Sequence, residues 1–209
     1  MIYRRDLKQR SRELFLEKYW LFVLTFLIYT TISGFNISFN LKLEDITFFN
    51  PKIILIAIVG IAVFVITGPM EGGMINFILN QNRYFNARIS DLFSGFFRFK
   101  DFFLTYLLTN IFIFLWSLLL IIPGIIKALA YSQAMYIMYD NPSLSPMEAI
   151  NESKRIMYGH KMELFKLHLS FLGWILLSVI TLNILNIFYV GPYYKTAIAL
   201  YYEEIKVNM

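Results

Sequence analysis

Long apolar stretches separated by short polar segments make up most of this chain. Six of these stretches could enter a lipid bilayer, because each is rich in bulky aliphatic and aromatic residues and carries few charges. They cover residues 19–39, 53–79, 102–122, 125–139, 162–182 and 184–202. The pattern therefore predicts an all-α membrane protein, with about six transmembrane helices in a single integral membrane domain over residues 1–209.

The fourth stretch, residues 125–139, is the shortest. Its 15 residues would form about 22 Å of helix at about 1.5 Å per residue, whereas the hydrocarbon core is about 30 Å thick. We therefore expect this span to thin the bilayer, to tilt little, or to lie partly inside the protein.

Three pairs of glycine and proline interrupt the apolar stretches. We expect a kink or a broken helix at the first pair, a turn between two spans at the second, and a break within the last span at the third. The predicted helix breaks are Gly68, Pro69, Pro123, Gly124, Gly191 and Pro192.

The N-terminal residues 1–18 predict a basic amphipathic helix on the cytoplasmic leaflet. Its apolar face would hold Tyr3, Leu7, Leu14 and Phe15. The basic residues around its other face are Arg4, Arg5, Lys8, Arg10 and Arg12. These cations would attract anionic lipid headgroups. Alternatively, they act only as a topology signal, without specific lipid recognition.

Two further polar segments predict amphipathic helices at the membrane surface. The first follows Ser90, a favourable N-cap, and its phenylalanines recur with helical spacing. The second begins at the motif SPME, residues 145–148, which has the form of a capping box with proline at the first helical position. Gly159 is the expected C-terminal stop of this helix.

The distribution of charge predicts the orientation of the chain. Of all residues in the chain, 58% are hydrophobic and only 16% are charged, which again favours a membrane protein. The net charge is +5. Lys and Arg gather in residues 1–18, 80–101 and 140–161, whereas the loop between the first two spans has only Lys42 and Lys52. The positive-inside rule therefore predicts a multi-pass protein of the cell membrane with both termini in the cytoplasm. It also explains the basic charge without nucleic acid as a partner.

A weak internal repeat accompanies this pattern. Three times a surface helix leads into a membrane segment, and three times a glycine and proline pair precedes a shorter apolar helix. We therefore predict three pseudo-equivalent units, each made of a surface helix and a helical hairpin.

Three charged residues follow these prolines within two to four positions: Glu71, Lys127 and Lys195. Charges at membrane depth are costly, so we predict that the three meet in an intramembrane polar centre if the prolines lie at similar depth. Such a centre could bind an ion, a carboxylate or a lipid phosphate. The simpler interpretation is a structural salt bridge, or lysines that extend to the membrane interface.

Enzyme activity is not expected. His160, Glu163 and His168 do not follow the compact spacing of a zinc-binding helix, and the chain has no cysteine. No nucleophile-elbow motif and no phosphate-binding loop motif occur. The sequence therefore predicts no catalytic residue, no metal and no cofactor.

Several motifs, in order, resemble a family of bacterial integral membrane proteins, domain of unknown function 975. They are SDLFSGF, FLWSLLLIIPGIIKALAYSQAMYIMYDNP, SKRIMYGHKMELFKLHLSFLGW and PYYKTAIALYYEEI, within residues 90–205, with weaker likeness in LKQRSRELF and GPMEGG. The resemblance implies a multi-span helical protein, mostly of Gram-positive bacteria, without an assigned cofactor. The family usually has a glycine-rich segment before the last Pro-Tyr, where this chain has the bulkier TLNILNIFYVGPYY.

Three functions fit these features. The first is a non-enzymatic membrane protein that acts on lipids, a protein partner or a second copy of itself, in envelope stress, immunity or regulation. The second is a small-solute or ion transporter or channel that uses the charged centre. The third is an accessory subunit of an exporter. A transporter predicts a water-accessible cavity at the charges, whereas a lipid or partner module predicts a packed interior and an exposed basic or aromatic inner face.

Overall fold

The computed structural model describes residues 4–34 and 51–207, and this part of the chain is built from helices without any strand. Tyr3 and the predicted outer loop with Lys42 lie outside the described residues. The elements are α1 (Arg4–Glu17), α2 (Tyr19–Ser33), α3 (Pro51–Tyr84), η2 (Ile89–Arg98), α4 (Phe99–Leu119), α5 (Ile121–Tyr131), α6 (Ala134–Asp140), α7 (Pro146–Ile156), α8 (Lys161–Ile180), η3 (Asn186–Val190) and α9 (Gly191–Val207).

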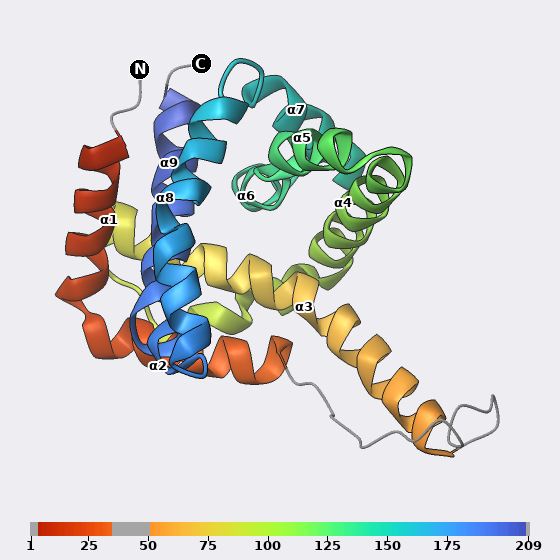
Figure 1. Cartoon of the computed structure of the whole chain (residues 1–209), viewed down its shortest axis with the longest axis horizontal. Helices are drawn as coiled ribbons and strands as arrows, with labels where there is room; N and C mark the ends of the chain where they lie inside the picture. The colour runs from red at the N-terminus through yellow and green to blue at the C-terminus, as the bar shows by residue number, and fades with distance from the viewer. Residues whose placement is uncertain (1–3, 35–50, 208–209) are drawn as a thin grey trace.

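Helix α3 is the longest element and crosses the molecule. Helix α1 packs against α9 on one side, and α2 turns away from α1 by 93° (Figure 1). The helices α4 and α5 form an antiparallel hairpin on the other side, and the N-terminal half of α3 projects beyond the rest of the bundle (Figure 1). The chain therefore folds around α3.

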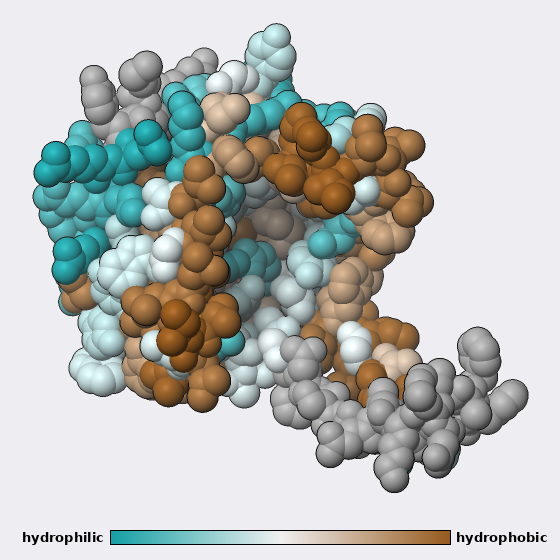
Figure 2. Space-filling model, in the orientation of Figure 1, coloured by the Kyte–Doolittle hydropathy of each residue, from teal (hydrophilic) through white to brown (hydrophobic). Residues whose placement is uncertain are grey.

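Four helical segments of the described residues are long and apolar enough to cross a membrane. They are Pro51–Tyr84, Ile89–Leu119, Ile121–Asp140 and Lys161–Ile180, and the bent pair of α1 and α2 would add a fifth. Hydrophobic side chains cover α8 and the α4–α5 hairpin on the visible face, while hydrophilic ones gather over α1 and α7 (Figure 2). This division of the surface is typical of a helical membrane protein.

Aromatic side chains join the N-terminal helices to α3. Phe15 of α1 and Phe22 of α2 are fully buried, and their ring centroids lie 5.9 Å apart. Phe22 also meets Phe77 of α3 edge-on, at 4.9 Å. Edge-on aromatic pairs add about 0.5–1.5 kcal/mol to the burial of their surface, so this cluster fixes α1 and α2 on the second half of α3.

Two glycines allow α3 and η2 to cross in backbone contact. A Cβ atom at Gly73 would lie 1.7 Å from the carbonyl oxygen of Leu92, and one at Gly95 would lie 1.9 Å from that of Pro69. No side chain fits at either position without moving a backbone. The crossing therefore requires glycine on both helices.

Of the kink or broken helix expected at Gly68 and Pro69, the break does not occur. Helix α3 is continuous from Pro51 to Tyr84, with Pro69 inside it. Gly68 lies against the backbone of α4, where a Cβ atom would be 3.0 Å from the oxygen of Phe102. Helix α4 and segment η2 pack against this part of α3, an environment in which membrane helices tolerate an internal proline.

The second predicted break, Pro123 and Gly124, is displaced by three residues. Leu120 is extended, with φ −159° and ψ 147°, and α5 already begins at Ile121. Pro123 therefore lies in the first turn of α5, where a missing N–H group costs little. Gly124 lets the hairpin close, because a Cβ atom there would lie 2.2 Å from Oγ of Ser117.

The third predicted break, Gly191 and Pro192, does not interrupt the helical path. A π-helical segment, η3, continues directly into α9 at Gly191. A Cβ atom at Gly191 would lie 2.1 Å from the ring of Phe26, so this glycine is required for close contact with α2. Pro192 is the second residue of α9 and directly follows the π-helical segment.

The predicted surface helices have different outcomes. The capping box of α7 is confirmed: Ser145 Oγ accepts from the Glu148 N–H at 3.3 Å, and Glu148 Oε2 accepts from the Ser145 N–H at 2.7 Å. Gly159 follows the helix with φ +85°. The predicted cap at Ser90 is wrong. The segment η2 is a 3₁₀ helix that begins at Ile89, so its N-cap residue is Arg88. The backbone N–H of Arg88 donates to the Asp91 carboxylate.

The Gly73→Ala substitution should destabilise the fold by about 3 kcal/mol, because the added methyl group forces the backbones of α3 and η2 apart. Gly60→Ala is the matched control in the same helix, since no atom lies within 4 Å of its Cβ position. The control should keep or raise stability by up to about 1 kcal/mol. Thermal unfolding in detergent measures both, and equal effects would contradict the close crossing.

Candidate functional site

Two of the three charged residues that the sequence singles out form a polar centre between α2, α3 and α9. Nζ of Lys195 lies 2.5 Å from Oε1 and 2.7 Å from Oε2 of Glu71. Tyr29 of α2 donates its hydroxyl to Oε2 of Glu71 at 2.6 Å. A carboxylate that accepts from an ammonium and a phenol has both of its oxygens satisfied.

The polar centre is only partly covered by the protein. The Lys195 and Glu71 side chains are 22% and 18% exposed. Nearby, the Tyr194 hydroxyl lies 2.7 Å from Nδ1 of His168 on α8. The molecule is hollowed between α8 and the α4–α5 hairpin, with hydrophilic side chains inside the hollow and hydrophobic ones on both rims (Figure 2).

Lys127 is not part of this centre. It lies in α5, and its Nζ is 4.4 Å from the ring centroid of Trp116 on α4. The expectation of equal depth fails because the prolines occupy different helical positions: Pro69 lies within α3, whereas Pro123 lies in the first turn of α5. A similar offset from proline therefore does not bring all three charges together.

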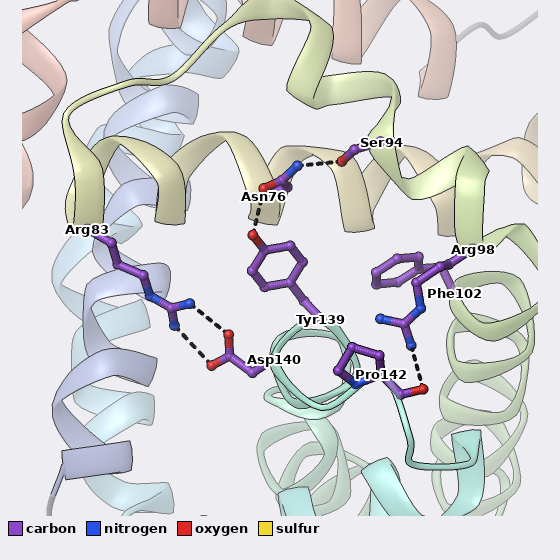
Figure 3. Close-up of a pocket in the computed structure, with 8 residues that line it drawn as sticks. All are labelled: Asn76, Arg83, Ser94, Arg98, Phe102, Tyr139, Asp140 and Pro142. Atoms are coloured by element: carbon purple, nitrogen blue, oxygen red, sulfur yellow. Dashed lines mark hydrogen bonds and ion pairs between the residues drawn. The ribbon is translucent and has the colours of Figure 1, made fainter.

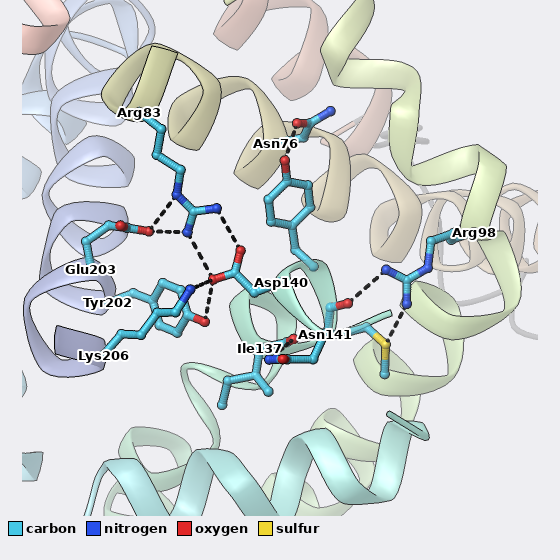
Figure 4. A network of polar contacts seen from close by, with 11 residues as sticks. Asn76, Arg83, Arg98, Ile137, Asp140, Asn141, Tyr202, Glu203 and Lys206 are labelled. Atoms are coloured by element: carbon cyan, nitrogen blue, oxygen red, sulfur yellow. Dashed lines mark hydrogen bonds and ion pairs between the residues drawn. The ribbon is translucent and has the colours of Figure 1, made fainter. Parts of the chain in front are cut away.

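A second polar cluster joins α3, α6 and α9 (Figure 4). The Arg83 guanidinium donates to both oxygens of Asp140, at 2.8 and 2.9 Å. Nε of Arg83 also donates to Glu203 at 3.1 Å, and the guanidinium makes a second bond to the same carboxylate. Bidentate contacts of this kind set distance and orientation together.

Asp140 is the centre of this cluster. Its Oδ2 atom also accepts from the Tyr202 hydroxyl at 2.9 Å and from Nζ of Lys206 at 2.6 Å (Figure 4). The Asp140 side chain is only 6% exposed. No local pattern in the sequence singles out Asp140, because its partners lie far away in the chain.

A pocket of about 400 Å³ opens beside the second cluster (Figure 3). Its lining residues are Asn76, Arg83, Ser94, Arg98, Phe102, Tyr139, Asp140 and Pro142. Their polar groups bond mainly to one another: Tyr139 donates to Asn76 at 2.6 Å, and Asn76 donates to Ser94 at 2.6 Å. Arg98 donates to the Met138 carbonyl at 2.9 Å. The pocket therefore offers few free donors to a ligand.

The predicted lipid-binding cations lie on α1 and separate into two groups. Arg4, Arg5 and Arg12 are exposed. Arg10 pairs with Glu204 at 3.0 Å, and Nζ of Lys8 lies 4.6 Å from the ring centroid of Phe171. Burial of Glu204 raises its pKa, which the nearby Arg10 partly offsets. Lys8 and Arg10 therefore help to attach α1 to the bundle.

The two histidines make separate contacts. Nδ1 of His160 lies 3.0 Å from Oε2 of Glu163, one turn away in sequence, whereas His168 contacts Tyr194. Within residues 4–34 and 51–207, no three potential ligands gather at a metal-sized site. We assign no metal role to either histidine.

One family model matches this chain, over residues 118–209, and its description is protein of unknown function (DUF975). The match confirms the resemblance that the motifs indicate. It contains Asp140, Lys195 and Glu203 but not their partners Glu71 and Arg83, so both polar clusters join the matched region to the preceding one. No curated protein and no solved structure matches the chain.

Removal of the Asp140 charge should loosen three helices at once. We expect Asp140→Asn to lower the free energy of unfolding by about 3 kcal/mol, because Arg83 keeps a single carboxylate partner in a poorly solvated site. The control is Asp101→Asn, whose carboxylate is 37% exposed and pairs with Arg98 one turn away. The control should change stability by less than about 0.5 kcal/mol. Denaturant titration in mixed micelles compares the two, and similar losses would contradict a central role for Asp140.

The polar centre should behave as a coupled pair. Glu71→Gln leaves the Lys195 ammonium without its counter-charge and should cost about 3 kcal/mol at membrane depth. The double variant Glu71→Gln/Lys195→Met should recover most of this loss in the same unfolding assay. Lys127→Met, outside the pair, should have little effect. Additive losses in the double variant would show that the two charges do not stabilise each other.

Proposed function

We propose that this chain is a non-enzymatic, multi-pass protein of the cell membrane that binds anionic lipid headgroups through α1 at the cytoplasmic face. Both termini would lie in the cytoplasm, as the distribution of Lys and Arg predicts. This orientation requires an even number of crossings. Six crossings, as the sequence predicts, meet this requirement. Four crossings, with one hairpin that does not cross, meet it as well.

The placement of α1 carries this proposal. Its apolar side chains Leu7 and Phe15 are buried in the bundle, so they are not available to insert into lipid. Its exposed cations Arg4, Arg5 and Arg12 nevertheless stay on the outside of the protein. A helix that is held by the fold and presents cations suits electrostatic contact with headgroups, each cation contributing about 1 kcal/mol.

The interior charges support a structural role better than transport. Glu71 and Lys195 bind each other directly, and Tyr29 occupies a further acceptor position of the carboxylate. A solute would have to displace these bonds before it could use either charge. The pair is therefore well suited to hold α2, α3 and α9 together.

Transport of a small solute or ion is the second candidate, and the hollow between α8 and the α4–α5 hairpin favours it (Figure 2). Hydrophilic side chains inside a hollow with hydrophobic rims could admit a polar solute from one side. The Lys195→Met variant discriminates: a transporter would lose solute flux in vesicles even where the variant stays folded.

Loss of two exposed cations of α1 should weaken the selectivity for anionic lipid. We expect Arg4→Gln/Arg5→Gln to lower the association constant for phosphatidylglycerol over phosphatidylcholine by at least about fivefold, since each cation contributes about 1 kcal/mol. Spin-labelled lipids in mixed vesicles measure this selectivity, at low and at high salt.

The matched control removes two other exposed cations, Arg88→Gln/Lys100→Gln. It should change the selectivity much less, and high salt should reduce the difference. An equal loss in both variants would refute a specific role of α1. An unchanged selectivity in the α1 variant would favour a protein partner, or a second copy of the chain, on this face.

A further inference from the structure

We propose that the α4–α5 hairpin enters the bilayer from the side of α7 and ends inside the hydrocarbon, with acyl chains as the partner of its aliphatic tip. The tip is defined as Leu118–Ile122. Length and hydropathy alone qualify Ile89–Leu119 and Ile121–Asp140, which contain α4 and α5, as membrane spans. Their packing against a charged surface helix leads to a different conclusion.

Helix α7 has to lie at the membrane surface. Its outer face exposes Glu148, Asn151 and Arg155, and Glu152 pairs with Arg155 along the same face. Each charge of this kind would cost about 2.5–3.5 kcal/mol or more at the bilayer centre. The exposed face of α7 therefore contacts water or lipid headgroups.

Ser153 on the opposite face of α7 ties this helix to the end of α5. Its hydroxyl donates to the Ala130 carbonyl at 2.8 Å and accepts from the Gln133 N–H at 3.2 Å. Nζ of Lys154 lies 5.7 Å from the ring centroid of Tyr131. The end of α5 is thus one helix diameter, about 10 Å, from the charged surface of α7.

The remaining length of the hairpin is too short for a crossing. From Ala130 to Ile121 α5 rises by about 14 Å, at about 1.5 Å per residue. On the other arm Phe112 packs beside Tyr131, at 6.1 Å between ring centroids, and only about 11 Å of α4 remain up to Leu119. The tip can therefore reach the middle of a hydrocarbon core of about 30 Å, but not its far side.

The chemistry of the tip agrees with this depth. All five tip residues are aliphatic, and they are between 67% and 76% exposed. The backbone still forms bonds through the turn: the Leu120 N–H donates to the Trp116 carbonyl at 3.3 Å, and the Gly124 N–H donates to the Leu120 carbonyl at 3.2 Å. A turn surrounded by lipid needs such internal partners.

Lys127 also finds a place in this arrangement. It lies about 5 Å along α5 from Ala130, and its ammonium packs on the ring of Trp116 on the facing arm. This cation–π contact stabilises the charge within the hairpin.

The hairpin of α8 and α9 provides the contrast within the same chain. Helix α8 has 20 residues, which is about 30 Å and enough for a crossing, as the 21 residues of α4 also would be, so the difference between the two hairpins lies in their tips. Its tip includes the polar residues Thr181 and Asn183, and Asn183 is exposed with φ +65°. A polar turn of this kind suits the far membrane surface, whereas the aliphatic tip of the other hairpin does not.

The absence of cysteine in the full sequence allows a direct depth measurement. A nitroxide spin label is attached to Leu120→Cys, with Asn183→Cys as the control for the far surface and Asn151→Cys as the control on α7. The variants are reconstituted in vesicles of phosphatidylethanolamine and phosphatidylglycerol. Collision with oxygen and with a water-soluble nickel chelate gives the depth of each label, and Leu119→Cys repeats the measurement if Leu120→Cys does not fold.

We expect the label at Leu120 to be the deepest, near the bilayer centre, with high oxygen and low nickel accessibility. The labels at Asn183 and Asn151 should lie close to the headgroups. A shallow label at Leu120, matching Asn183, would show that the hairpin crosses and would overturn the proposal. A label at Leu120 as accessible to nickel as Asn151 would place the hairpin outside the hydrocarbon and would overturn it as well. Neither result depends on whether α1 binds anionic lipid.

Discussion

Two ion pairs control how α3 and α9 meet. Glu71 of α3 contacts Lys195 of α9, and further along both helices Arg83 of α3 contacts Glu203 of α9. The order of the two contacts is therefore the same along both helices. Their C-terminal ends therefore lie on one side of the molecule, next to Asp140. A helix pair fixed at two levels by ionic bonds cannot slide or rotate without leaving a charge unpaired, which would cost several kcal/mol.

The two ionic contacts depend on close packing elsewhere in α3. Gly73 and Gly95 bring η2 into backbone contact with α3, and α4 packs against Gly68, where a Cβ atom would lie 3.0 Å from the Phe102 carbonyl oxygen. These contacts surround Pro69 and keep the helix continuous where its hydrogen-bond ladder lacks a donor. Glu71 of the polar centre lies within this region, between Gly68 and Gly73. The glycines thus set the position of the helix from which both charged residues of α3 extend.

Local patterns in the sequence predicted the helical membrane fold, the capping box of α7 and the residues Glu71 and Lys195 that meet in the structure. They failed where the outcome depends on tertiary packing. The glycine and proline pairs predicted breaks. An α-helix nevertheless tolerates a proline in its first turn, as at Pro123, or where neighbouring helices pack around the proline. No local pattern pointed to Asp140, because its partners Arg83 and Tyr202 are more than fifty residues away in sequence.

Hydropathy measures whether a helix can tolerate lipid, whereas the depth of a helix is set by the charged elements attached to it. Helix α8 carries its charges at one end and a polar turn at the other, so its apolar length is available for crossing. The end of α5 is bonded to a helix whose outer face is charged, and this bond limits the depth of the α4–α5 hairpin to the near half of the bilayer. A hairpin confined in this way takes up area in one leaflet only. The exposed cations of α1 would act on the headgroups of that same leaflet, so both proposed lipid contacts of this protein concern the cytoplasmic half of the membrane.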